Sequence, residues 1–144
     1  MAESKPIKYG SSDGSYIAAG QLEGITKLVD SFYNCMGSLP AAKKIRAMHP
    51  EDLTVSRDKL VCFLSGWLGG PRLYSKKYGS ISIPMVHKHL SVASEERDAW
   101  LLCMREAAND QPYHDSFKRY LLEQLFVPAE RVRQVSQEKS DGKD

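Results

Sequence analysis

The amino-acid sequence predicts an all-α fold. Through most of the 144 residues, apolar side chains recur three and four positions apart, a spacing that places them on one face of a helix. No stretch alternates convincingly between apolar and polar residues, as a half-buried strand would. The loop expected over residues 71–83 is too long for a simple up-and-down bundle, whose connections usually span about 2–8 residues.

Three helices are predicted in the first half of the chain. They cover residues 22–36, 41–48 and 55–68. Each is followed by residues that break helices, namely Gly37 and Pro40, Pro50, and Gly69-Gly70-Pro71. The stripes of the two longer helices consist of Ile25, Leu28, Val29, Phe32, Tyr33, Met36, Leu60, Phe63, Leu64 and Trp67. Such stripes are typical of helices that bury one face in a core.

Two further long helices are predicted over residues 95–109 and 112–126, and a short one that carries His87 is expected to begin at Pro84. Ser94 can cap the helix that follows it. Acidic residues usually mark a solvated helix start, and here they are Glu95, Glu96 and Asp98. The two stripes are formed by Trp100, Cys103, Met104, Ala107, Phe117, Tyr120, Leu121 and Leu125.

The two ends of the chain are polar. Residues 1–15 are expected to form a flexible leader and residues 135–144 a flexible tail, which leaves one domain over residues 16–134. Pro128 is expected to open only a final short helical turn.

Charge and composition exclude several classes of protein. The net charge is +2 and the basic residues are dispersed, which argues against a nucleic-acid partner. No run of about 20 apolar residues predicts a membrane span, and no signal peptide is evident, so a cytoplasmic protein is expected. The three cysteines form neither a CxxC nor a CxxCH motif, and we expect them to be small core residues.

Candidate functional residues are few when only spacing is considered. The four histidines lack the HExxH pattern of a zinc helix, and a single histidine is more often a surface or hydrogen-bonded residue than a metal ligand. Tyr33 and Trp100 lie in apolar stripes, where aromatic residues usually belong to the core. Periodicity and spacing therefore lead no further than a soluble helical domain.

Five segments in order resemble the truncated haemoglobins. They are Phe32-Tyr33, residues 49–53, residues 63–74, Met85-Val86-His87 and residues 96–101. Trp100 together with the Gly-Gly-Pro motif is similar to the group II, or O-type, branch of that family. The resemblance extends over residues 18–126, most of the chain.

The resemblance implies a two-over-two helical sandwich around haem b. His87 takes the place of the proximal iron ligand, which leaves one axial position of the iron open for a diatomic ligand. Lys59 matches a position that often pairs with a haem propionate. The other residues that the resemblance places against haem are Phe32, Phe63, Arg72, Tyr74, Met85 and Val86.

On the distal side the resemblance places Tyr33, His49, Ser56, Leu60 and Trp100. Oxygen bound to ferrous haem carries partial negative charge, so donors aimed at it are worth more in a dry pocket than in water. Tyr33 and Trp100 supply such donors, and His49 adds another, directly or through Tyr33. The small Ser56 at the gate leaves the entry route open. Without an external ligand, Tyr33, His49 or water are alternatives for the sixth position.

Two departures from the family pattern stand out. Many relatives have a glycine pair before the second helix, where this chain has Gly20-Gln21. Many also have arginine just before the proximal histidine, where this chain has Val86. That change removes one propionate contact.

The functional prediction is a haem protein that binds O₂, NO and CO, with peroxide or sulfide as further ligands. A donor-rich pocket releases oxygen slowly, which favours redox or detoxification chemistry, such as nitric oxide dioxygenation or peroxide reduction with an unknown reductase. The alternative is oxygen storage, delivery or sensing without catalysis. A monomer or weak dimer is expected, with neither nucleic acid nor membrane as a partner.

Overall fold

The computed structural model describes residues 9–79 and 92–140, and every regular element in these ranges is a helix. The predicted all-α class is confirmed. In chain order the elements are α1 (Gly14–Ala18), α2 (Gln21–Ser38), the 3₁₀ helix η1 (Pro40–Ala42), α3 (Lys43–Ala47), α4 (Thr54–Trp67), α5 (Leu73–Tyr78), α7 (Ser94–Asn109) and α8 (Asp115–Ser140). In the described ranges, none of them has the length and hydrophobicity needed to cross a bilayer.

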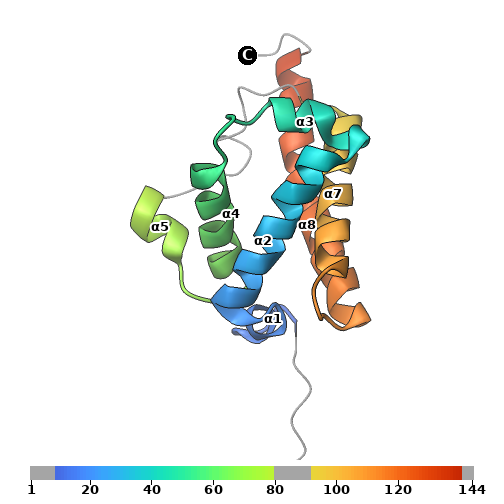
Figure 1. Cartoon of the computed structure of the whole chain (residues 1–144). Helices are drawn as coiled ribbons and strands as arrows, with labels where there is room; N and C mark the ends of the chain where they lie inside the picture. The colour runs from blue at the N-terminus through green and yellow to red at the C-terminus, as the bar shows by residue number, and fades with distance from the viewer. Residues whose placement is uncertain (1–8, 80–91, 141–144) are drawn as a thin grey trace, which may run out of the picture.

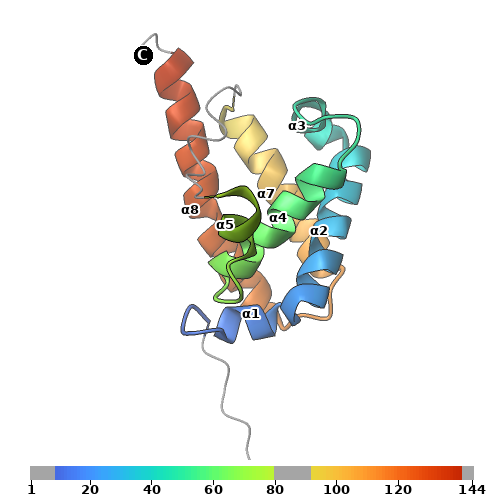
Figure 2. The same ribbon diagram turned by 90° about the vertical axis from the view of Figure 1, so that its left-hand side faces the viewer.

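Four long helices form two packed pairs. Helix α2 contacts both α4 and α7, and α7 also contacts α8. The pair α2 and α4 therefore lies over the pair α7 and α8, while α5 lies on the outer side of α4 (Figures 1 and 2). This arrangement is the two-over-two sandwich that the resemblance implied.

The core lies where α2 crosses its neighbours. All six residues of its predicted stripe are buried. They meet buried residues of α7 and α8, namely Ala99, Cys103, Met104, Ala107, Ala108, Phe117, Leu121 and Leu125. Burying a large apolar side chain contributes about 1.5–3 kcal/mol, so this stripe fixes the position of α2. The position of α2 in turn determines where Tyr33 lies.

The glycine pair after α4 admits the N-terminal segment. Gly69 has a φ of +96°, and a Cβ there would lie 2.1 Å from the carbonyl oxygen of Ser12. A Cβ on Gly70 would lie 2.3 Å from the ring of Tyr16. The pair therefore provides both a sharp exit from α4 and room for another part of the chain.

The predicted flexible leader over residues 1–15 needs correction from Tyr9 onward. The ring of Tyr9 packs edge-on against Phe117 at 5.3 Å, Ser15 is buried, and α1 begins at Gly14. Residues 71–83 were expected to be a loop, but α5 forms within them. Lys77 and Tyr78 at the end of α5 both bond to Asp58 of α4, which supplies contacts that no local pattern encodes.

The end of the chain differs most from expectation. Helix α8 runs to Ser140 without stopping at residue 126, and it continues through Pro128. The predicted short turn at Pro128 and flexible tail from residue 135 are therefore wrong as far as residue 140. A proline within a helix removes one backbone hydrogen bond. Contacts beyond Pro128 offset that loss, because Glu130 pairs with Arg97 and the buried Ser136 accepts a hydrogen bond from Val92.

The start of α7 also differs from expectation. Ser94 is its first residue rather than its cap. Glu96 is only 4% exposed, and its carboxylate accepts a hydrogen bond of 2.8 Å from the backbone N–H of Ala93. The prediction of a solvated acidic start is wrong for this residue. Its buried carboxylate satisfies a backbone group that precedes the helix.

Candidate functional site

Tyr33 lies at the centre of the candidate site. Its side chain is 6% exposed and its ring packs edge-on against Phe32 at 5.0 Å and against His49 at 5.8 Å. The hydroxyl donates to the backbone carbonyl of Ser56 on α4 at 3.4 Å. That distance is long for a hydroxyl donor, so the bond is weak and the hydroxyl remains able to serve a better acceptor. Predicted distal residues from α2, α4 and the α3–α4 connection thus come together.

The phenol of Tyr33 is neutral near pH 7. Burial raises its pKa to about 12, although the positive charge of Arg57 opposes the shift. A neutral phenol donates a hydrogen bond, whereas an anionic internal ligand requires the phenolate. The raised pKa keeps the proton on the hydroxyl, so Tyr33 can act as a hydrogen-bond donor in the pocket.

His49 has a defined hydrogen-bonding pattern. Its Nδ1 lies 2.8 Å from the carbonyl oxygen of Ile45. A carbonyl only accepts, so we assign the proton of the neutral ring to Nδ1 and the lone pair to Nε2. In this tautomer Nε2 carries no proton, so it can accept a hydrogen bond but cannot donate one to a ligand. The contact with Ile45 therefore indicates an acceptor at Nε2, whereas the resemblance implied a donor.

Large apolar side chains form a wall beside these polar groups. Phe32 is fully buried, and Trp100 of α7 packs edge-on against it at 5.1 Å. Leu60 and Phe63 on α4 are only partly buried, as is Trp100. Trp67, four positions further along α4, stacks on Phe63 at 6.0 Å and extends this wall.

The predicted polar contacts to a cofactor lie at the outer edge of α4 and on α5. The Nζ of Lys59 lies 5.3 Å from the ring centroid of Tyr78, which in turn packs 5.1 Å from Tyr74. Arg72 immediately precedes α5 and is exposed. Helix α5 packs against α4, which places these side chains beside the α4 residues of the site. Met85, Val86 and His87 lie outside the described residues.

Two charged groups near the site were not singled out from the sequence. Arg57 of α4 reaches Asp30 of α2 at 3.6 Å, and its Nε is buried with no hydrogen-bond partner among the described residues. Only the helix packing reveals this pair, since the two residues are far apart along the chain.

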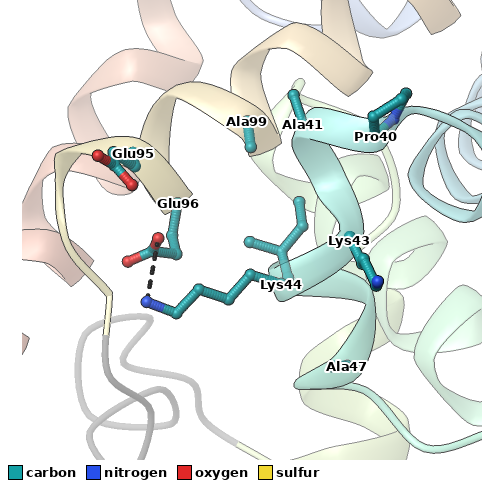
Figure 3. A pocket seen from close by; sticks show the side chains of 9 residues that line it. Pro40, Ala41, Lys43, Lys44, Ala47, Glu95, Glu96 and Ala99 are labelled. Atoms are coloured by element: carbon teal, nitrogen blue, oxygen red, sulfur yellow. Dashed lines mark ion pairs between the residues drawn. The ribbon is translucent and has the colours of Figure 1, made fainter.

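A pocket of about 440 Å³ opens between residues 40–47 and the start of α7 (Figure 3). Lys44 and the buried Glu96 form an ion pair of 3.4 Å across it. Ile45 also lines the pocket, as do the small side chains of Ala47 and Ala99. Ile45 is also the residue whose carbonyl holds His49.

Comparison with known proteins places this geometry in a family. Residues 15–133 match the bacterial-like globins. The chain belongs to the bacterial-like globin family. Within it, this globin groups with the group II truncated haemoglobins, as the resemblance implied.

Individual relatives agree with that assignment. The globin is 33% identical over 122 residues to the group 2 truncated hemoglobin YjbI of Bacillus subtilis, covering 85% of this chain and 89% of the relative. It is 29% identical to the group II 2-on-2 hemoglobin of Agrobacterium tumefaciens, with a TM-score of 0.79 and coverage of 92% and 98%. A truncated oxygen-avid haemoglobin from Bacillus subtilis has 33% identity, a TM-score of 0.74, and coverage of 82% and 97%.

Globins of this family carry haem b, and the described residues fit that cofactor. Partly buried aromatic and aliphatic side chains supply an apolar wall, as a porphyrin requires, and a buried phenol lies beside it. Exposed cations on α4 and before α5 suit carboxylates such as propionates. The protein is therefore a haem protein that binds oxygen and other diatomic gases.

Proposed function

We propose that His87 is the proximal iron ligand and that this globin holds oxygen for redox or detoxification chemistry. The observation that supports the oxygen-holding role is the buried hydroxyl of Tyr33, which lies 3.4 Å from the Ser56 carbonyl. Because that contact is long, the hydroxyl keeps its capacity to donate to a diatomic ligand in the pocket.

The haem contacts belong to the same proposal. Phe32, Leu60 and Phe63 supply the apolar wall, and Lys59 and Arg72 supply positive charge for the propionates. Lys59 can leave the ring of Tyr78 for a carboxylate, because an exposed cation–π contact is worth only about 0.5–1 kcal/mol. The remaining proposed contacts are Tyr74, Met85 and Val86.

Three polar groups shape the distal side. Tyr33 donates through its hydroxyl and Trp100 through its indole N–H. His49 accepts through Nε2, which orients the Tyr33 hydroxyl or a water. Ser56 is small and partly exposed, so it leaves the route to Tyr33 open to small molecules.

The proposed reactions need electrons from outside the protein. When bound, haem relays the one electron that converts nitric oxide and dioxygen to nitrate, or the two that, with two protons, reduce peroxide to water. A reductase resupplies them. Tight holding of oxygen suits such chemistry because the second reactant must arrive before oxygen leaves.

Oxygen storage, delivery or sensing is the second candidate. One observation bears on the choice, since a similar Bacillus subtilis protein is described as oxygen-avid. Hydrogen bonds from Tyr33 and Trp100 to bound oxygen would give this chain a similarly high oxygen affinity. The slow oxygen release that follows suits delivery poorly. A sensor, by contrast, tolerates slow release, so the two functions are separated by turnover rather than by affinity.

Nitric oxide turnover of the oxygenated protein is the deciding measurement. Stoichiometric nitrate and rapid consumption are expected from the wild type, and repeated turnover is expected with a supplied reductant. His87→Ala should lose haem during purification. Oxygen retention without nitrate formation or peroxide reduction would favour storage or sensing instead.

A further inference from the structure

The described chain resumes at Val92, five residues after His87. Three attachments follow within six residues. The backbone N–H of Val92 donates to Ser136, the backbone N–H of Ala93 donates to Glu96, and the guanidinium of Arg97 pairs with Glu130. The first and third reach the part of α8 that lies beyond Pro128.

The contact between Val92 and Ser136 is short and protected. The backbone nitrogen lies 2.7 Å from the serine Oγ, and Ser136 is 4% exposed. A backbone N–H that is taken from water without a partner is costly, so the hydroxyl oxygen fixes where Val92 can lie. Ser136 is therefore more than a solvated tail residue.

The carboxylate of Glu130 accepts hydrogen bonds from two arginines, Arg97 of α7 and Arg133 of α8. Its Oε1 lies 2.8 Å from Nη1 of Arg97 and 2.6 Å from Nε of Arg133, and its Oε2 lies 2.7 Å from Nη2 of Arg133. The three side chains are 17–23% exposed. Arg97 also lies 5.2 Å from the ring centroid of Phe126. These charge-assisted bonds hold the start of α7 against α8.

We propose that Ser136 and the Arg97–Glu130–Arg133 network are positioning residues for the proximal side of the haem. The inference rests on the proposed role of His87. Five residues span at most about 18 Å, so fixing Val92 confines the region that His87 can reach. The same contacts explain why α8 continues past Pro128, where the helix loses a backbone hydrogen bond.

The test uses the full chain reconstituted with haem and the variant Ser136→Ala. Ser136→Thr keeps a hydroxyl oxygen, and Ser116→Ala is the matched control because Ser116 lies on the same helix and bonds to Tyr9 at 2.8 Å. The measurements are the iron–histidine stretching band of the ferrous, ligand-free protein and the rate of haem transfer to a scavenging apoglobin. Thermal unfolding of each haem-free chain is recorded in parallel.

Ser136→Ala is expected to shift or split the stretching band and to speed haem transfer about twofold to tenfold, the range that corresponds to one lost hydrogen bond. Ser136→Thr and Ser116→Ala should retain the wild-type band. A lower melting temperature with an unchanged band and transfer rate would overturn the inference. If Ser136→Ala does not fold, Glu130→Gln is measured in the same way, with the same expected shift and the same overturning result.

The proposed function fails in a different way. A wild-type protein that lacks an iron–histidine band, or a His87→Ala variant that keeps it, would overturn the role of His87 and this inference with it. A wild-type band that persists unchanged in Ser136→Ala would overturn only the positioning role.

Discussion

Removing the Tyr33 hydroxyl separates its role toward ligands from its role in the fold. In Tyr33→Phe the ring stays, so the edge-on contacts with Phe32 and His49 are kept. The lost bond to Ser56 is 3.4 Å long, and the carbonyl of Ser56 also lies in the hydrogen-bond ladder of α4. We therefore expect the free energy of unfolding to change by less than about 0.5 kcal/mol.

Oxygen release should respond far more strongly. A hydrogen bond to a charged acceptor contributes about 1.5–3 kcal/mol, which corresponds to about tenfold to hundredfold in rate. The assay is stopped-flow displacement of oxygen from the ferrous protein, with thermal unfolding measured on the same preparations. The expected pattern is a large kinetic effect with almost no loss of stability.

Tyr113→Phe is the matched control. The hydroxyl of Tyr113 donates to the carbonyl of Ala19 at 2.9 Å, and Ala19 is fully buried. Its removal should lower stability by about 1–3 kcal/mol and leave oxygen release unchanged. An unchanged release rate in Tyr33→Phe, or equal kinetic effects in the two variants, would refute the assignment of Tyr33 as a ligand donor.

Three further outcomes are expected. Trp100→Phe should speed oxygen release about threefold to tenfold, because an aromatic wall remains while the N–H is lost, and an unchanged stopped-flow rate would contradict this. Hydrogen bonds from Arg133 and then Arg97 hold the pKa of Glu130 at about 2, below its ordinary 4.5, so its stabilising effect is complete above pH 4.5 and lost as pH falls through about 2. Acid unfolding followed by circular dichroism should accordingly be less steep over that range in Glu130→Gln, and identical curves would count against the ion pairs. Gln21→Gly should raise the free energy of unfolding by about 0.5–1 kcal/mol in denaturant titrations, since Gln21 has a φ of +59° that glycine adopts without strain, and a loss of stability would contradict that reasoning.

Local pattern was sufficient for the parts of the fold that repeat. The six-residue stripe of α2 follows helical spacing, and all six residues are buried as predicted. Gly69 ends α4 where the sequence suggested, because a sharp turn needs a backbone conformation that glycine adopts at low cost. Tyr33 and Trp100 could be named as site candidates only through the family resemblance, since core aromatic residues have the same spacing.

The sequence by itself determined the helical class, the main helices and the buried face of α2, because these depend on the periodicity of neighbouring residues. Only the tertiary structure showed which ring nitrogen of His49 already has a partner, since its Nδ1 lies 2.8 Å from the backbone carbonyl of Ile45 on α3. It also decided that α8 continues through Pro128 and that Glu96 is buried. Those outcomes depend on contacts with distant segments, such as that of Ser136 with Val92, 44 residues apart. Local propensity cannot encode such contacts, because their free energy arises only after the helices have packed.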